Sequence, residues 1–174
     1  MKRKKAKKRG IEIGSPREIQ SREVRIASLK QLRIFVKNFA KTLRGGEVIA
    51  LSGPLGAGKT TFAQLLGKAL GVGERITSPT FTLMHIHRTR KPLPSSPLAK
   101  GRGERLSILV HIDAYRLANA RALQNIGALD YLGRPDTVAV VEWAEKVRRV
   151  LPRGTRWINF KIKSDGKSRE LRIS

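Results

Sequence analysis

The sequence contains no cysteine among its 174 residues. This absence excludes a disulfide framework, a thiolate metal site and a cysteine nucleophile, and it fits a reducing compartment. Aromatic residues make up only 5%, so we expect a core built mainly of Val, Ile and Leu. No apolar run approaches the roughly 18 residues of a membrane-spanning helix, and no signal-peptide segment follows the basic start. We therefore expect a cytoplasmic protein with no membrane segment.

Acidic residues are also few, since 13 Asp and Glu stand against 37 Lys and Arg, a formal charge of +24. Such an excess goes beyond what solubility needs and indicates a polyanionic partner, either nucleic acid or a membrane surface. Binding to nucleic acid would weaken steeply with salt, because each neutralised phosphate releases a counterion. A generally basic lineage or a solubilising tail would give the same composition, so charge alone leaves the partner open.

Basic residues are concentrated in two segments. We expect residues 1–20 to form a disordered arm, because Met1 to Arg9 holds seven Lys or Arg and no acid. Residues 21–174 are expected to form one domain, interrupted by a proline-rich loop at residues 88–105 with six basic residues and one acid. A loop of this length in a compact domain is either functional or an unstructured insertion.

Apolar periodicity predicts alternating strands and helices. Helices are expected from Ser28 to Leu43, over Thr60–Leu70 and over Leu117–Leu132. Strands are expected at Val48–Leu51, Phe81–Ile86, Leu106–Asp113, Thr137–Val141, Arg156–Lys163 and Arg169–Ile173. This order predicts an α/β fold of three layers, with a mostly parallel sheet covered on both faces and a C-terminal antiparallel hairpin at one edge.

A glycine-rich segment follows the first of these strands and opens a helix. Gly53-Pro54-Leu55-Gly56-Ala57-Gly58-Lys59-Thr60 has the spacing of a phosphate-binding loop, whose backbone N–H groups form an anion nest at the helix start. Lys59 is expected to reach the β- and γ-phosphates of ATP, and the Thr60 hydroxyl to complete a Mg²⁺ shell. The expected nucleotide-binding residues of this loop are Gly53, Leu55, Gly56, Ala57, Gly58, Lys59, Thr60 and Thr61. The sheet is then of the P-loop NTPase type.

Hydrolysis of ATP also needs a second carboxylate and a group near the γ-phosphate. Asp113 and Glu142 end two predicted strands, and the carboxyl ends of parallel strands meet at one crevice. Taken alone, each carboxylate also suits a surface charge or a helix cap. His111 lies on the same sheet face as Asp113 and could orient the site or serve only as a core histidine. His85 and His87 lack clustered carboxylates, so we expect no zinc site.

Four stretches together resemble the TsaE (YjeE) family over about Ile26 to Pro152. They are Gly53 to Thr61, Ser78-Pro79-Thr80-Phe81-Thr82, His111-Ile112-Asp113-Ala114-Tyr115-Arg116-Leu117 and Glu142-Trp143-Ala144-Glu145-Lys146. The resemblance implies a P-loop ATPase that assists threonylcarbamoylation of the adenosine beside the anticodon of tRNA. It also implies work with the TsaD and TsaB proteins, without transfer of the threonylcarbamoyl group by this chain itself, and weak activity without those partners.

The resemblance further implies roles for single residues. Lys59, Asp113 and Thr80 would be catalytic, with Thr80 sensing the γ-phosphate, whereas Thr60 and Glu142 would bind Mg²⁺. Trp143 and Lys146 would lie near the nucleotide or the partner surface. Pro54 stands where the family often has an acid, but a backbone cradle does not depend on that side chain.

Two other interpretations stay open from the sequence. A small-molecule P-loop kinase would use arginines of a lid near the transferred phosphate, and Arg88, Arg90, Arg102 and Arg105 could form one. A nucleotide-switched RNA-binding protein would depend on the basic arm and turn over little ATP. Free phosphate as the product favours the ATPase, whereas a phosphorylated acceptor favours the kinase.

Overall fold

The computed structural model describes residues 22–90 and 108–174. Within them, a seven-stranded mixed sheet has the order β1-β7-β6-β2-β5-β4-β3. Its strands are β1 (Arg22–Ile26), β2 (Val48–Ser52), β3 (Met84–Arg88), β4 (Ile108–Asp113), β5 (Thr137–Glu142), β6 (Arg156–Ile162) and β7 (Arg169–Ile173). The helices are α1 (Leu29–Ala40), α2 (Lys59–Ala69) and α3 (Ala120–Asn125), with shorter 3-10 segments η2 (Ala128–Asp130) and η3 (Ala144–Val150).

The centre of the sheet is parallel and its margins are antiparallel. β2 pairs in parallel with β5 and β6, and β4 pairs in parallel with β5. Every residue of β2 and β5 is buried, as expected of strands covered on both faces. The predicted hairpin is confirmed, because β7 runs antiparallel to β6. The outermost strand on that side, however, is β1, which the sequence did not predict.

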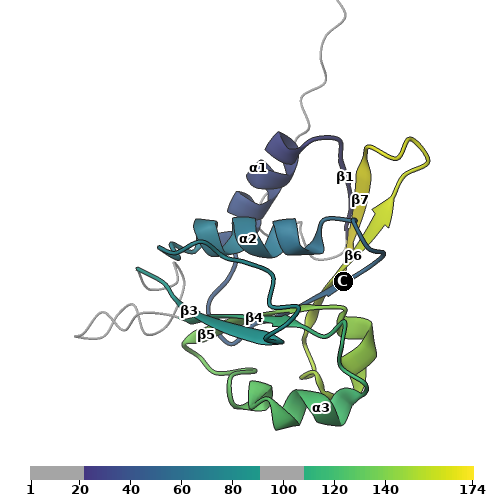
Figure 1. Ribbon diagram of the computed structural model, residues 1–174. Coiled ribbons are helices and arrows are strands. Elements are labelled where there is room, and N and C mark those ends of the chain that lie inside the picture. Colours follow the sequence, from purple (N-terminus) through teal and green to yellow (C-terminus); the bar gives the residue numbers. More distant parts are fainter. Residues whose placement is uncertain (1–21, 91–107) are drawn as a thin grey trace, which may run out of the picture.

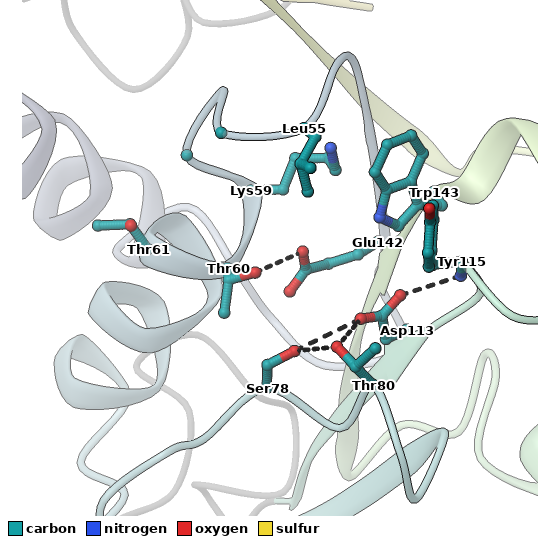
Figure 2. A pocket seen from close by; sticks show the side chains of 12 residues that line it. Leu55, Lys59, Thr60, Thr61, Ser78, Thr80, Asp113, Tyr115, Glu142 and Trp143 are labelled. Carbon is teal, nitrogen blue, oxygen red and sulfur yellow. Dashed lines mark hydrogen bonds between the residues drawn. The ribbon is translucent and has the colours of Figure 1, made fainter.

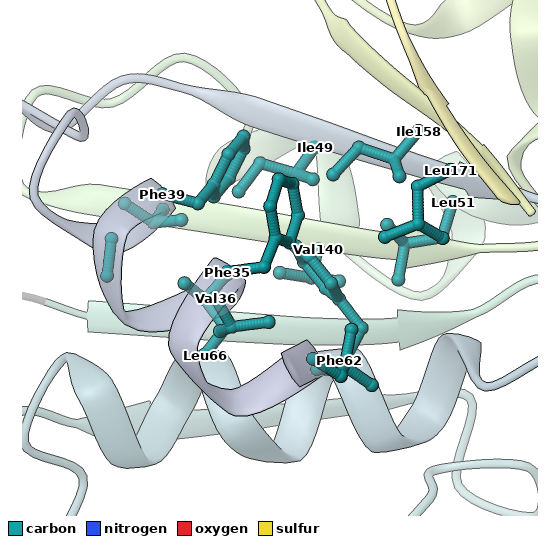
Figure 3. Packing of buried hydrophobic residues seen from close by; sticks show 14 of the residues in the cluster. Phe35, Val36, Phe39, Ile49, Leu51, Phe62, Leu66, Val140, Ile158 and Leu171 are labelled. Carbon is teal, nitrogen blue, oxygen red and sulfur yellow. The ribbon is translucent and has the colours of Figure 1, made fainter. Parts of the chain in front are cut away.

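Helices cover both faces of the sheet, which confirms the three layers (Figure 1). α1 and α2 lie on one face, and α3 lies on the other. Phe35 and Phe39 of α1 and Phe62 of α2 pack between these helices and the sheet (Figure 3), and Phe160 of β6 belongs to the same cluster. The rings of Phe62 and Phe160 pack edge to face at 6.0 Å, so α2 is fixed directly against the sheet.

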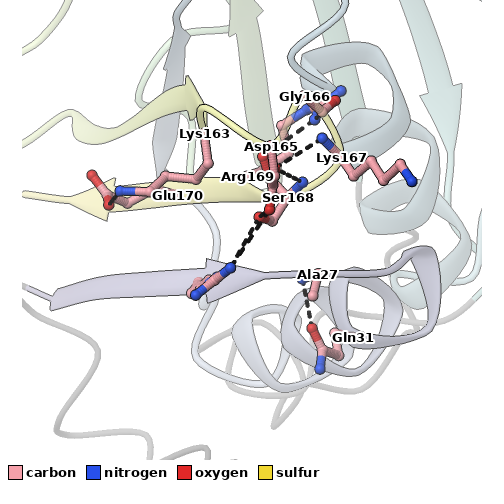
Figure 4. Close-up of polar contacts among 10 residues, drawn as sticks. Ala27, Gln31, Lys163, Asp165, Gly166, Lys167, Ser168, Arg169 and Glu170 are labelled. Atoms are coloured by element: carbon pink, nitrogen blue, oxygen red, sulfur yellow. Dashed lines mark hydrogen bonds and ion pairs between the residues drawn. The ribbon is translucent and has the colours of Figure 1, made fainter.

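The turn between β6 and β7 is held by polar contacts around Asp165 (Figure 4). Asp165 accepts hydrogen bonds from the backbone N–H and the hydroxyl of Ser168, and Arg25 of β1 lies 3.5 Å from its carboxylate. Immediately beyond the turn, Arg169 donates to the carbonyl of Gly56 at 3.2 Å. The β6–β7 hairpin is thereby hydrogen-bonded to the glycine-rich loop that precedes α2.

Several boundaries differ from those predicted, and the first helix ends at Ala40 instead of Leu43. β3 begins at Met84, because residues 79–83 form a turn closed by the Leu83 N–H on the Pro79 carbonyl. Arg88 belongs to β3 and not to the basic loop, of which residues 91–105 lie outside the described residues, as does the arm 1–20. The helix predicted over Leu117–Leu132 is wrong in extent, since Gly127, with a φ of 71°, separates α3 from η2.

None of the helices in residues 22–90 and 108–174 combines the length and the apolar character needed to cross a membrane.

Candidate nucleotide site

The loop from β2 to α2 depends on two glycines for different reasons. Gly53 has a φ of 126°, and a Cβ placed there would lie 2.3 Å from the carbonyl oxygen of Phe160. Gly58, the N-cap of α2, has a φ of 104°, and its Cβ would meet no atom within 4 Å. The first glycine allows the loop to approach β6, and the second leaves the start of α2 open. The free N–H groups of a helix start attract anions.

Lys59, the first residue of α2, is buried at the base of the loop. Its Nζ donates to the carbonyls of Gly53 at 2.6 Å and Pro54 at 2.9 Å, and it lies 3.7 Å from the ring centre of Trp143. Burial lowers the pKa of Lys59, while the carboxylates of Glu142, Glu145 and Asp113 act in the opposite direction. The two carbonyls therefore hold the Lys59 amino group at the loop, close enough to the carboxylates of Glu142 and Asp113 for these to affect its pKa.

Glu142 is the last residue of β5, and its side chain contacts both α2 and β4. Its Oε2 accepts the hydroxyl of Thr60 at 2.7 Å (Figure 2), and its Oε1 lies 2.8 Å from Nε2 of His111. Glu142 and His111 are both almost fully buried. Two elements far apart in the sequence thus fix the two oxygens of one carboxylate.

Asp113 ends β4 directly beside Glu142, its register partner on β5. Its Oδ2 accepts the hydroxyl of Thr80 at 2.6 Å and that of Ser78 at 3.4 Å, and its Oδ1 accepts the N–H of Tyr115 at 2.9 Å (Figure 2). The turn before β3 is therefore fixed to the end of β4 through hydroxyl groups.

These side chains surround one cleft of about 350 Å³ at the carboxyl ends of β2, β4 and β5. Its lining residues are Leu55, Gly56, Gly58, Lys59, Thr60, Thr61, Ser78, Thr80, Asp113, Tyr115, Glu142 and Trp143. The predicted convergence of the phosphate loop with both carboxylates is present in the structure. Most of the residues singled out from the sequence line the cleft.

Three of the predicted residues do not line the cleft. The side chain of Ala57 is buried in the core, and Gly53 contributes its carbonyl to Lys59. Lys146 is exposed and donates to the carbonyl of Tyr115. Ser78 and Tyr115 also line the cleft, although the sequence analysis does not name them as site residues. Both lie in stretches that resemble the TsaE family, and each is two residues from a predicted site residue, Thr80 or Asp113.

The residues present fit a nucleotide with Mg²⁺. The open side of Gly58 leaves room for phosphate at the helix start, where Lys59 supplies positive charge. Thr60 and Glu142 place two oxygen atoms 2.7 Å apart. Mg²⁺ is usually held by one or two protein oxygens together with phosphate oxygens and water, so this pair suffices. Within the described segments no three His, Asp or Glu side chains form a metal-binding group.

A phosphate loop between a buried parallel strand and a helix, with carboxylates ending the neighbouring strands, defines a P-loop nucleotide-binding domain. The family model described as "Threonylcarbamoyl adenosine biosynthesis protein TsaE" matches residues 26–171. The chain belongs to the TsaE family.

Two curated relatives and one solved structure illustrate the similarity. The protein named "tRNA threonylcarbamoyladenosine biosynthesis protein TsaE" from Treponema pallidum is 36% identical over 134 residues, covering 77% of this chain and 86% of the relative. The protein of the same name from Streptomyces coelicolor is 40% identical over 115 residues, covering 66% and 68%. The structure described as "Crystal structure of Bacillus subtilus YdiB" aligns with a TM-score of 0.60 at 27% identity, covering 88% of this chain and 84% of that one.

Proposed function

We propose that this protein is a Mg²⁺-dependent ATPase that takes part in threonylcarbamoylation of tRNA, with TsaD and TsaB as its partners and the cytoplasm as its compartment. The names of its relatives support the pathway. The observation that carries the ATPase is the convergence of Lys59 and Thr60 with Glu142 and Asp113 in one cleft. A loop that only bound phosphate would need neither carboxylate.

In this proposal the start of α2 binds the phosphates. Backbone N–H groups from Gly58 onward donate to phosphate oxygens, and Lys59 turns from the loop carbonyls to the β- and γ-phosphates. Thr60 and Glu142 would hold Mg²⁺, whose positive charge would offset the negative charge that develops during phosphoryl transfer. Trp143, whose ring lies against the Lys59 ammonium, restricts where that ammonium can move.

Asp113 and Thr80 act at the γ-phosphate end of the cleft. Water attacks the γ-phosphorus, the bond to the β–γ bridging oxygen breaks, and ADP and inorganic phosphate leave. Asp113 orients the attacking water, and three donors hold its carboxylate in place for that task. Thr80 lies in the turn before β3 and donates to Asp113, so its position can report whether a γ-phosphate is bound.

The test is phosphate release from ATP by the full chain, alone and with TsaD, TsaB and tRNA. Lys59→Ala and Glu142→Ala are compared with Lys68→Ala and Glu23→Ala, two exposed residues of the same types on α2 and β1. We expect partner-stimulated release that both site variants lose and both controls keep.

A phosphorylated acceptor in place of free phosphate would show a kinase instead. Absence of ATP binding by the wild-type chain under every condition would overturn the proposal. Lack of hydrolysis by the isolated protein would not, because partners often complete a regulatory ATPase.

A further inference from the structure

His111 lies inside the sheet, at the β4 position opposite Val140 of β5. Its side chain is fully buried, and Nε2 lies 2.8 Å from Oε1 of Glu142. The other ring nitrogen, Nδ1, meets no hydrogen-bond partner among the described residues. Neither Asp113 nor the phosphate loop bonds directly to this histidine in the contacts described above. Within residues 22–90 and 108–174, the one hydrogen bond of its side chain is therefore with the proposed Mg²⁺ ligand.

The geometry of that contact fixes its direction. Glu142 already accepts the hydroxyl of Thr60 at Oε2, and an ionised carboxylate can only accept, so Nε2 of His111 carries the proton and donates. Nδ1 is then a buried acceptor without a donor, which costs free energy. Phenylalanine would fill a similar volume without that cost. The bond to Glu142 is what the histidine adds at this position.

Glu142 needs such a partner because its terminal torsion is otherwise weakly defined. The last torsion of a glutamate side chain has a broad, roughly two-fold preference, so packing on the aliphatic part does not orient the carboxylate. One bond at each oxygen, from Thr60 and from His111, fixes the carboxylate plane. Residues that hold a metal ligand in this way typically change metal affinity by about 10- to 100-fold when removed.

We propose that His111 is a positioning residue, which orients Glu142 so that Oε2 and the Thr60 hydroxyl together bind the divalent cation that accompanies the nucleotide. This inference rests on the proposed function, because it assumes that Glu142 binds Mg²⁺. It assigns the histidine no proton transfer and no contact with the nucleotide.

The experiment measures nucleotide affinity with and without the metal. The β,γ-imido analogue of ATP is titrated calorimetrically into the full chain in Mg²⁺ and in EDTA, and the ratio of the two dissociation constants gives the metal-dependent gain. We expect His111→Phe to reduce that gain by about 10- to 100-fold while the affinity in EDTA is unchanged. His111→Gln should retain most of the gain, because its amide nitrogen can donate to the same carboxylate.

His87→Phe is the matched control. His87 is also buried in this sheet and also contacts a glutamate, Glu74 at 2.5 Å, but Glu74 does not line the cleft. Its replacement should leave the metal-dependent gain as in the wild type. Urea midpoints establish that each variant is folded, and His111→Leu removes the same donor with a smaller side chain if phenylalanine is not accommodated.

The outcomes separate the two proposals. An unchanged gain in folded His111→Phe or His111→Leu would overturn the positioning role. Equal losses in His111→Phe and His111→Gln would also overturn it, since the donor would then not be the cause. A further loss when His111→Phe is added to Glu142→Ala would show that the histidine acts elsewhere. No metal-dependent gain in the wild type would contradict the Mg²⁺ site of the proposed function itself.

Discussion

Two glycines of the phosphate loop, Gly53 and Gly58, should differ in how much their replacement by alanine lowers the free energy of unfolding. At Gly53 and at Gly58 the backbone has φ values of 126° and 104°, which L-residues rarely adopt, so each substitution carries a conformational cost of about 1–3 kcal/mol. Only at Gly53 does the new Cβ also meet backbone, the Phe160 carbonyl at 2.3 Å. Overpacking of this kind adds about 1–3 kcal/mol.

We therefore expect Gly58→Ala to lower the free energy of unfolding by about 1–3 kcal/mol and Gly53→Ala by about 2–6 kcal/mol, the sum of both costs. Urea unfolding of the nucleotide-free variants, compared at equal m-values, measures the difference. Gly58→Ala should stay folded and lose nucleotide binding, because its Cβ projects into the open side of the cleft. Equal destabilisation by the two substitutions would refute the reasoning, because it would mean that β6 moves away from the new Cβ at no cost in free energy.

Two further predictions concern Thr80 and Asp165. Thr80→Val keeps the shape of the side chain but removes the donor to Asp113. Phosphate release in the presence of partners should fall about 100-fold, because Asp113 no longer orients the attacking water, while ATP affinity is retained. An unchanged rate would exclude the role of Thr80. Hydrogen bonds, chiefly from Ser168, lower the pKa of Asp165 from 3.8 to about 2. A carboxyl group whose pKa is lower in the folded state stabilises the fold when the pH is above its unfolded pKa. This stabilisation is lost as the pH falls through the folded pKa of about 2. The urea midpoints of wild type and Asp165→Ala should accordingly converge between pH 5 and pH 2, and a constant gap would contradict this.

Much of the fold follows from local patterns in the sequence. β2 and β5 are continuous apolar runs, and α1 begins where Ser28 accepts the N–H of Gln31 at 3.2 Å, as the capping pattern predicts. β1 was missed because Arg22–Ile26 contains only two apolar residues, and its pairing with β7 depends on residues far along the chain. Such a strand at the margin of a sheet has little local signal.

The candidate site divides in the same way. The phosphate loop is a local motif, so Lys59 and Thr60 could be placed from spacing alone. Asp113 and Glu142 could be expected at one edge, because both end strands of a parallel sheet. The sequence left the role of His111 open, because its partner lies 31 residues away and the contact depends on the register of β4 against β5. Register is fixed by packing of the whole sheet and is not a local property.

The pairing of β1 with β7 and of β2 with β6 has a consequence for synthesis of the chain. The strand beside the phosphate loop, β6, begins at Arg156, and β1 finds its partner only in Arg169–Ile173. Contacts between residues so far apart form late, because the entropy of closing the intervening chain is lost before they contribute. Nearly all of the described sequence must therefore emerge from the ribosome before Gly53 can pack against Phe160. Nucleotide binding should accordingly be a property that the nascent protein acquires only after translation of its last strands.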